Sequence, residues 1–213
     1  MTAASKADLV LIGCGGHAKV VLEAIWARTP KRRVIVLDDN PAAGTSRLLG
    51  VPVLGTRDWL LGANYSLKVV AAIGDNRARL SLIRWIAGQN FGMETVIHPS
   101  AVLGSTVEIG RAAFLSAGSI VIADSKIGRG AIINTGASID HDCVIGEAAH
   151  IGPGVRLCGN VTIGPRSLLG VGVAVRPGIS IGADVVVGAG STVVSDLPDA
   201  GVYIGSPARR FKS

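Results

Sequence analysis

Hydrophobic residues recur at every sixth position through the second half of the chain. From Ile97 to Val193 each of these positions holds Ile, Leu or Val, and the position that follows is often glycine. The fifth position of each six-residue unit is small or aliphatic throughout. An antiparallel sandwich with glycine-rich turns is the alternative fold, but its strands would alternate with a period of two. A period of six instead predicts a parallel β-helix built from hexapeptide repeats.

The predicted β-helix extends from residue 96 to residue 198. If three units form one coil of 18 residues, the repeat provides between five and six coils. The first and fifth positions of each unit would point into a narrow interior that admits Ile, Leu and Val. Glycine at the second position would allow the backbones of successive coils to approach closely.

The first 95 residues follow a different pattern, which predicts a Rossmann-like α/β domain. A short apolar strand over 8–12 runs into a glycine-rich turn, and a helix follows that ends near Pro30. A second strand, Val34–Leu37, is closed by Asp38 and Asp39. Strand, glycine turn, helix, strand and acidic residue open a nucleotide-binding βαβ unit, in which helix N–H groups face a phosphate.

The glycine turn fits this motif, since Gly13, Gly15 and Ala18 match G-x-G-x-x-G/A. A third strand, 68–73, leads into Gly74-Asp75-Asn76, and a helix follows around 79–87. The second mononucleotide-binding half is missing, so we expect one nucleotide and not a dinucleotide. The candidate substrate-binding residues are Gly15, Gly16, His17, Asp38, Asp39, Gly74 and Asn76.

Two simpler interpretations of this turn remain open. The glycines could form a tight strand-to-helix connection that holds no ligand. His17 could cap or pack against the helix and make no contact with a ligand. The convergence of three strand ends on one crevice favours ligand binding at the carboxyl edge of the sheet.

Chemistry within the β-helix is concentrated in one coil. His141 lies between Asp140 and Asp142, and a carboxylate beside an imidazole is what a general base requires. With 18 residues to a coil, Ala123 and Gly159 would stack on His141 and leave space for a substrate. A solvent-facing corner histidine is the alternative. His150 falls on another flank of the prism, which disfavours a metal site within one chain.

Composition and charge limit the classes of ligand that the chain is expected to bind. The chain has 213 residues with a formal net charge of +6. Its longest basic run is Lys31-Arg32-Arg33, so nucleic acid is a weaker interpretation than phosphorylated metabolites. The three cysteines show no C-x-x-C spacing, which supports neither a disulfide framework nor a zinc ribbon. Without a long apolar run or a signal-peptide pattern, we expect a cytoplasmic protein that does not insert into membranes.

Over essentially its whole length the chain resembles the hexapeptide-repeat sugar acyltransferases that carry an N-terminal nucleotide-binding domain. This branch includes sialic acid O-acetyltransferases and N-acetyltransferases of nucleotide-linked 4-amino-sugars, such as the bacillosamine and GDP-perosamine enzymes. The motifs that carry the resemblance are the turn 15–19, Asp38-Asp39, Gly74-Asp75-Asn76, the block 133–146, and Gly205-Ser206-Pro207-Ala208-Arg209.

The resemblance implies a left-handed β-helix, a homotrimer, and acetyl-CoA in the groove between neighbouring helices. It implies that His141 is the general base, that Asp142 raises its basicity, and that Asn134 lies near it. Relatives often carry Glu where this chain has Asp142, so a shorter carboxylate must reach the imidazole. The residues that the resemblance assigns to acetyl-CoA are His150, from the adjoining subunit, together with Gly159, Gly170 and Val171.

The sequence therefore predicts an N-acetyltransferase that moves acetyl from acetyl-CoA to a nucleotide-linked 4-amino-4,6-dideoxysugar by direct transfer, without a metal. Such an enzyme would serve surface polysaccharide or glycan synthesis. O-acetylation of a sialic acid is the alternative reaction, and a non-catalytic CoA-binding scaffold or an NAD-dependent enzyme is the alternative class. The segment 199–213 would cap the last coil, where Arg209 or Arg210 could reach CoA phosphates, or form a solvated tail.

Overall fold

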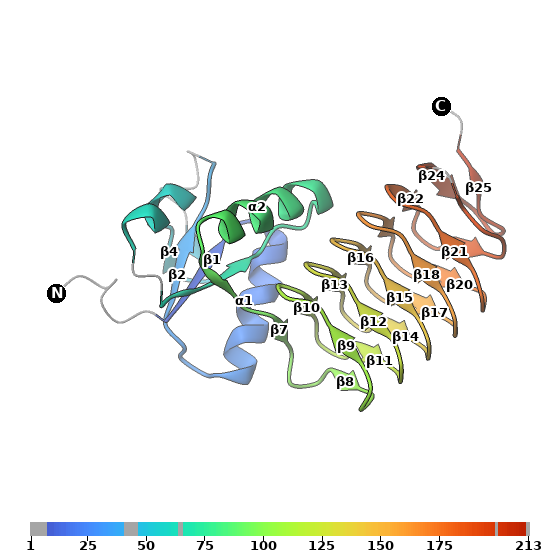
Figure 1. Cartoon of the computed structure of the whole chain (residues 1–213), viewed down its shortest axis with the longest axis horizontal. Coiled ribbons are helices and arrows are strands. Elements are labelled where there is room, and N and C mark those ends of the chain that lie inside the picture. The colour runs from blue at the N-terminus through green and yellow to red at the C-terminus, as the bar shows by residue number, and fades with distance from the viewer. Residues whose placement is uncertain (1–7, 41–46, 64–65, 199, 212–213) are drawn as a thin grey trace. The chain divides into compact units, whose positions relative to one another are not determined.

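The chain forms two compact units, Met1–Val96 and Ile97–Ser213. The computed structural model describes residues 8–40, 47–63, 66–198 and 200–211. The first unit is an α/β domain and the second is a left-handed parallel β-helix (Figure 1). Both fold classes agree with the hydrophobic patterns of the sequence.

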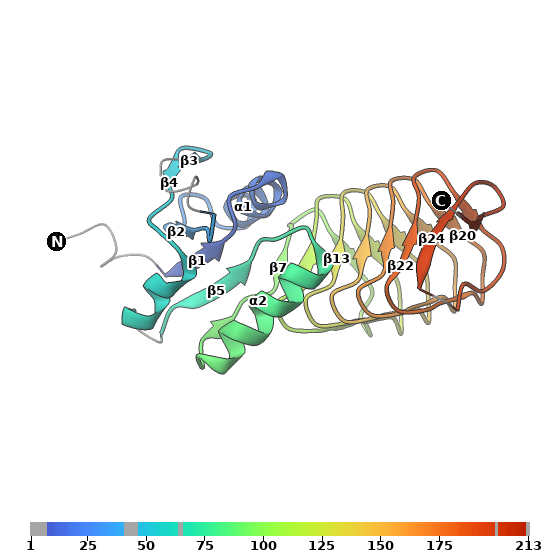
Figure 2. The ribbon, with the colours of Figure 1, turned by 90° about the horizontal axis from the view of Figure 1, so that it is seen from above.

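The α/β unit is built on a four-stranded parallel sheet in the order β2-β1-β5-β6. Helices α1 (Gly16–Arg28) and α2 (Asn76–Gly88) cover its opposite faces (Figure 2). This arrangement follows from right-handed crossovers that leave the centre of the sheet in opposite directions. The strands are β1 (Leu9–Ile12), β2 (Val34–Leu37), β5 (Lys68–Ala71) and β6 (Gly92–Met93).

Three smaller features of this unit were not predicted from the sequence. A hairpin joins β3 (Arg47–Leu48) to β4 (Val51–Pro52), and a 3₁₀ helix, η3, spans Arg57–Gly62. Helix α2 begins earlier than its apolar pattern indicates, because the Asp75 side chain accepts a hydrogen bond from the N–H of Ala78 at 2.8 Å. This cap starts the helix at Asn76.

The β-helix has three flanks, each formed by one parallel sheet. Strands pair with the strand 18 residues away, as Ile132 with His150 and Ser138 with Arg156. The first flank comprises β7 (Val96–Ile97), β10 (Phe114–Leu115), β13 (Ile132–Ile133), β16 (His150–Ile151), β19 (Leu168–Leu169), β22 (Val185–Val187), β24 (Gly201–Ile204) and β25 (Arg209–Arg210).

The other two flanks contain only short strands of two residues. The second comprises β8 (Val102–Leu103), β11 (Ile120–Val121), β14 (Ser138–Ile139), β17 (Arg156–Leu157), β20 (Ala174–Val175) and β23 (Thr192–Val193). The third comprises β9 (Glu108–Ile109), β12 (Lys126–Ile127), β15 (Val144–Ile145), β18 (Thr162–Ile163) and β21 (Ser180–Ile181).

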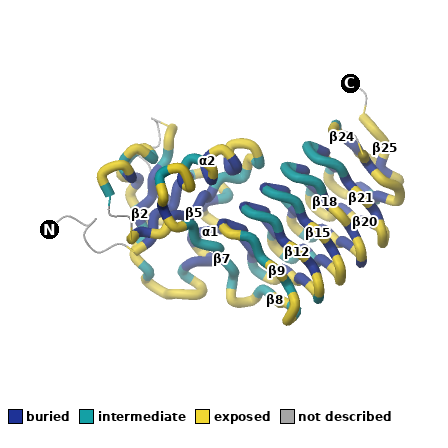
Figure 3. The backbone as a smooth tube through the Cα atoms, viewed as in Figure 1, coloured by how far each residue is buried: buried dark blue, intermediate teal, exposed yellow. Residues whose placement is uncertain are grey.

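The interior of the prism is formed by the first and fifth positions of the repeat, as the pattern predicts. First-position residues such as Leu115 and Ile139 and fifth-position residues such as Ala137 and Val155 are completely buried. Figure 3 shows buried and exposed segments alternating in the same order from coil to coil. At the start of the helix the core is less well covered, and Leu103 is 37% exposed.

Glycine at the second position is required by the distance between coils. A Cβ on Gly146 would lie 2.5 Å from the backbone nitrogen of Pro165, and one on Gly128 would lie 2.7 Å from the carbonyl carbon of Gly146. Real Cβ atoms do not approach backbone atoms so closely. The second-position glycines therefore set the spacing of the coils.

The fourth position of the repeat has a left-handed backbone, a feature that was not predicted. Every sixth residue from Ala112 to Gly190 has a φ between +51° and +73°. Half of these residues are glycine, and Asp or Asn fills several of the others, in line with their tolerance of this conformation. The corners from 112 to 190 therefore share a left-handed residue at the fourth position.

The first flank continues beyond the end of the sequence repeat at Pro198. Strand β24 pairs with β22 in parallel, and β25 then folds back antiparallel to β24. The guanidinium of Arg210 donates to the carbonyl of Ala200 at 3.2 Å, and Arg209 donates to that of Ala208 at 3.0 Å. Lys212 of the tail lies outside the described residues.

The two kinds of glycine should respond differently to the same substitution. Gly146→Ala forces backbone atoms of two coils apart, and we expect a loss of about 3 kcal/mol in the free energy of unfolding. Gly136→Ala places its Cβ in open space at a φ of +62°, so only the left-handed backbone costs about 1 kcal/mol. Urea unfolding followed by circular dichroism measures both. Equal losses would contradict the role assigned to the second position.

Candidate functional site

His141 lies on the corner between β14 and β15. Its backbone N–H donates to Oδ1 of Asp140 at 2.9 Å, and its carbonyl accepts from the N–H of Asn160 in the next coil at 3.0 Å. About half of the side chain (53%) is exposed. The corner therefore holds the backbone of His141 on both sides and leaves the imidazole accessible to a substrate.

Asp142 contacts the ring directly. Its Oδ2 lies 2.7 Å from Nδ1 of His141, so the short carboxylate does reach the imidazole. Asp142 occupies the left-handed fourth position of its unit, with φ +59°, and its N–H donates to the carbonyl of Ala123. The hydrogen bond that Asp142 accepts from the ring, together with the negative charge of Asp140, raises the pKa of His141.

Gly159 lies against the face of the His141 ring. A Cβ on Gly159 would be 2.6 Å from Nε2 and 3.0 Å from Nδ1 of His141. The sequence predicted that this glycine leaves space for a substrate beside the ring. The structure corrects that expectation, because the imidazole itself occupies the space.

Asn134 and His150 come together on the first flank of the prism. Nδ2 of Asn134 lies 3.0 Å from Nε2 of His150, and Oδ1 of Asn134 accepts from the N–H of Thr135. Within one chain the carboxamide of Asn134 therefore bonds to His150 rather than to His141. Gly170 and the exposed Val171 lie on the same corner as Asn134, two coils further along.

In the α/β unit, the loops after β1, β2 and β5 meet at the carboxyl edge of the sheet. A Cβ on Gly13 would lie 2.5 Å from the carbonyl oxygen of Ala72, so only glycine allows β1 and β5 to end so close together. Oδ2 of Asp38 accepts from the N–H of Cys14 at 2.6 Å. This edge is where the strand order reverses, the usual ligand position in open α/β sheets.

The predicted phosphate-binding turn opens helix α1. Gly15 is the N-cap residue without a side-chain cap, and a Cβ on Gly15 or Gly16 would meet nothing within 4 Å. His17 lies beside the next loop, since a Cβ on Gly74 would be 3.5 Å from its Cβ. The first turn of α1 is therefore open on one side and bordered by Gly74 on the other.

The remaining predicted residues of this edge are held by arginines. Asp39 pairs with Arg57 at 3.4 Å, and that guanidinium lies 5.0 Å from the centre of the Trp85 ring. Asn76 accepts a hydrogen bond from Arg79 through its side-chain oxygen at 2.8 Å. Arg57 thus connects the loop of Asp39 to Trp85 of α2. Arg79, which is part of α2, connects that helix to the Gly74 loop.

Sequence reasoning missed Arg79, which is only 1% exposed. Its guanidinium donates to the carbonyls of Ile73 and Gly74, at 3.1 and 2.8 Å, and so fixes the loop that faces α1. Burial lowers the pKa of Arg79 to about 10. The signal was its spacing from Ile83 and Ile86, which places an arginine on the buried face of the helix.

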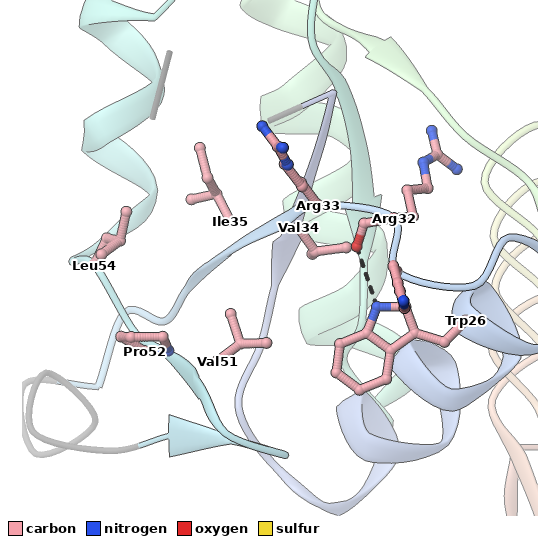
Figure 4. Close-up of a pocket in the computed structure, with 9 residues that line it drawn as sticks. Trp26, Arg32, Arg33, Val34, Ile35, Val51, Pro52 and Leu54 are labelled. Atoms are coloured by element: carbon pink, nitrogen blue, oxygen red, sulfur yellow. Dashed lines mark hydrogen bonds between the residues drawn. The ribbon is translucent and has the colours of Figure 1, made fainter. Parts of the chain in front are cut away.

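A pocket with a volume of about 380 Å³ lies at the opposite, amino end of β2. Its wall is the indole of Trp26, held by a hydrogen bond from Nε1 to the carbonyl of Arg32 at 3.2 Å (Figure 4). Apolar side chains from β2 and β4 line the rest together with Leu54 and the basic run Lys31-Arg32-Arg33. None of the predicted substrate-binding residues lines this pocket.

The described part of the chain contains neither a candidate metal site nor a candidate membrane-spanning helix. No cluster of three or more His, Cys, Asp or Glu side chains there could hold a metal ion. Among the same residues, no helix is long and apolar enough to cross a membrane. Burial raises the pKa of the thiols of Cys14 and Cys143, whereas Cys158 is exposed.

Two family models match the chain, one in each unit. The PglD N-terminal domain matches residues 8–86, and the bacterial transferase hexapeptide, with six repeats, matches residues 124–159. The UDP-N-acetylbacillosamine N-acetyltransferase of Bacillus subtilis is 36% identical over 120 residues. That match covers 52% of this chain and 51% of the relative, so the chain spans about half the length of the curated relative it matches.

Solved structures match the chain over nearly its full length. The perosamine N-acetyltransferase of Caulobacter crescentus, solved as a histidine variant with CoA and GDP-perosamine, is 43% identical with a TM-score of 0.90 and 98% coverage of both chains. The acetyltransferase domain of PglB from Neisseria gonorrhoeae, solved with acetyl coenzyme A, is 35% identical with a TM-score of 0.90. It covers 95% of this chain and 98% of its own.

Removing the Asp142 carboxylate should lower the pKa of His141. In Asp142→Asn the hydrogen bond to a negative oxygen is lost, and we expect the pKa of the imidazole to fall toward its ordinary value. An NMR titration of the histidine Cε1–H signals measures the change, with Asp124→Asn on the preceding coil as the matched control. An unchanged pKa in Asp142→Asn would show that Asp142 does not govern the ring.

Proposed function

The chain belongs to the sugar N-acetyltransferases of the hexapeptide-repeat superfamily, and we propose on that basis that it acetylates the 4-amino group of a nucleotide-linked 4-amino-4,6-dideoxysugar. Acetyl-CoA is the donor, and a GDP-linked sugar is the first choice of acceptor. The reaction would take place in the cytoplasm and serve surface polysaccharide or glycan synthesis. The carrying observation is the exposed His141–Asp142 pair on a corner of the β-helix.

The geometry of this pair supports the role of general base. Asp142 accepts a hydrogen bond from Nδ1–H of His141, which leaves the lone pair of Nε2 for the substrate. Because Asp142 raises the pKa of the ring, the neutral imidazole is a stronger base. A solvated corner histidine would need no carboxylate held at 2.7 Å.

The proposed reaction is direct transfer in a ternary complex. Nε2 of His141 takes a proton from the sugar amine as the amine nitrogen attacks the thioester carbonyl. The new C–N bond forms, the C–S bond breaks, and the proton on the imidazole passes to the departing thiolate. The N–H of Gly159, next to the ring, is the candidate donor to the oxyanion.

A covalent acetyl-enzyme has no support at this site. Cys143 is fully buried, and burial raises the pKa of its thiol. The thiol form is a poor nucleophile, and an inward side chain cannot reach a substrate on the surface. Cys158 is exposed, but it lies on the coil that holds Gly159 and has no base of its own in this scheme.

We assign the nucleotide diphosphate to the carboxyl edge of the α/β sheet. The open first turn of α1, at Gly15 and Gly16, suits a phosphate, and His17, Gly74 and Asn76 border it. Asp38 and Asp39 would face the nucleoside. The choice of GDP rests on the Caulobacter crescentus enzyme, which was solved with GDP-perosamine and is 43% identical over 98% of the chain.

A homotrimer would complete the site. His141 is on the corner after the second flank, whereas His150 and its partner Asn134 are on the first. We propose that His150, Asn134, Gly170 and Val171 of an adjoining chain hold acetyl-CoA opposite His141. In this arrangement the domain 1–95 selects the sugar nucleotide, the β-helix 96–198 performs the transfer, and the segment 199–213 caps it.

Two impaired variants should partly restore activity to each other if the site lies between chains. We expect His141→Ala alone to reduce kcat by about 10²–10⁴-fold, because it removes the base. His150→Ala should mainly raise the KM for acetyl-CoA. When the two variants are co-expressed and form mixed trimers, a native site needs His141 from one kind of chain and His150 from the other. Each of these has a chance of about one half, so about a quarter of the sites combine both native residues.

The measurement is the acetylation rate at limiting acetyl-CoA, compared with that of the two variants purified separately and then mixed without exchange. Failure to recover activity in mixed trimers would place the site within one chain. Near-native turnover of His141→Ala would overturn the assignment of the base.

A substrate panel distinguishes the acceptor. With acetyl-CoA, we expect turnover of GDP-perosamine to exceed that of a UDP-linked or dTDP-linked 4-amino-sugar, and free sialic acid to be inert, since it offers no nucleotide to the α/β unit. Thiol release and mass spectrometry of the product measure this. Faster O-acetylation of sialic acid would favour the alternative reaction, and tight NAD binding without acetyl-CoA binding, measured by calorimetry, would overturn both.

A further inference from the structure

The corners of the β-helix close in two different ways. At most corners the fifth-position N–H donates to the second-position carbonyl of the same turn, as Ala137 to Asn134 at 3.0 Å and Ala149 to Gly146 at 3.1 Å. The corner that holds His141 does not follow this pattern. The N–H of Cys143 donates instead to Oγ of Ser125 at 3.1 Å, and Ser125 Oγ donates to the carbonyl of Asp140 at 2.8 Å.

A side chain from the preceding coil is therefore inserted into this turn. Ser125 is fully buried and sits at a fifth, inward position directly below Cys143 in the stack. Its hydroxyl bridges the first and last residues of the turn 140–143, taking the place of the direct bond between them. The turn is held open from inside the prism, and His141 and Asp142 are the two residues that it displays.

The next corner of the same column is bridged in the same way. The thiol of Cys143 donates to the carbonyl of Cys158 at 3.2 Å and interacts with the backbone of Val161, so it spans the turn that carries Gly159. The imidazole of His141 and the glycine that it contacts are thus displayed by two successive opened turns. Cys143 therefore has a polar contact at both of these turns.

We propose that Ser125 is a positioning residue for the His141–Asp142 pair, acting through the opened turn that its hydroxyl bridges. This inference rests on the proposed role of His141 as the base. Ser125 touches neither the ring nor any surface that a substrate could reach. Without its hydroxyl, the buried N–H of Cys143 and the carbonyl of Asp140 lose the partner they share and could regain one only by moving toward each other, which would close the turn.

Closing the turn would move Asp142 relative to the ring, because Asp142 is the third residue of the turn and His141 the second. The groups that act on the imidazole are Asp140 and Asp142 on its own corner. On the following coil, the ring has as neighbours Gly159, which is uncharged, and the thiol of Cys158. On the preceding coil, its neighbours are Ala123 and Asp124. Asp142 is the one hydrogen-bonded to the ring, so the distance from Oδ2 to Nδ1 decides the effect.

The β-helix provides a matched control at another corner. Ser167, also fully buried, accepts from the N–H of Val185 at 3.0 Å and donates to the carbonyl of Gly182 at 2.6 Å. Its turn displays Ala183 and Asp184 and no residue assigned to the reaction. Ser125→Ala and Ser167→Ala therefore remove the same bridge, one at the site and one away from it.

The experiment compares the two variants in three measurements. We expect both to lose a similar amount of thermal stability. Only Ser125→Ala should lower kcat, by about tenfold, since a displacement of about 1 Å in a catalytic group can cost up to 100-fold. In an NMR titration, only Ser125→Ala should shift the pKa of His141 downward, and the acid limb of the pH profile of kcat/KM should move to lower pH with it.

Ser125→Cys is the conservative variant, because Cys143 already bridges the next corner of this column through a thiol. It should restore most of kcat, and it replaces Ser125→Ala as the test if that protein does not fold. Equal losses of kcat in Ser125→Ala and Ser167→Ala, or an unchanged pKa of His141 in Ser125→Ala, would overturn the inference. A shifted pKa with unchanged turnover would instead contradict the role of His141 as the base.

Discussion

The stacking of one coil on the next is the constraint on which the β-helix unit depends. Strands pair in parallel with residues 18 positions away, and the second-position glycines bring the corners into backbone contact. Because a Cβ on Gly128 or Gly146 would collide with the backbone of the next coil, the spacing at these corners is fixed by the backbone itself. A side chain on a corner therefore has a defined position relative to the corners above and below it.

The His141 site uses this fixed spacing twice. Gly159 on the following coil leaves room for the imidazole, and Ser125 on the preceding coil holds the turn that carries it. Asp142 completes the arrangement through its left-handed backbone, which directs the carboxylate to the ring. The exposed His141–Asp142 pair is thus held by buried groups from the two adjacent coils, which limit the freedom that exposure would otherwise give it.

In the α/β unit the candidate site is made of loops, which are held in position by other contacts. Three strand ends converge where the strand order reverses, and close contact between Gly13 and Ala72 fixes two of them. The buried Arg79 then satisfies the carbonyls of the Gly74 loop, which would otherwise be costly to leave without partners. Such contacts can hold the loops of the candidate nucleotide site in position while leaving them exposed.

The sequence alone determined the two fold classes and the inward positions of the prism. These follow from short-range periodicity, which reports directly on which side chains are buried. The sequence did not determine the left-handed fourth positions, because Ala and Arg share that geometry with the Gly, Asp and Asn residues that tolerate it best. In the sequence, Arg79 and Ser125 stand out only as polar residues at buried positions, and the sequence does not show which groups they bond to.

What only the tertiary structure decided is which groups meet across coils and loops. The imidazole fills the space over Gly159, the Ser125 hydroxyl enters the turn of the next coil, and Asn134 bonds to His150. The repeat specifies that residues 18 positions apart are neighbours, but not the direction of each side chain. That direction is set by the hydrogen bonds left available at each corner, which depend on the three-dimensional contacts of the backbone.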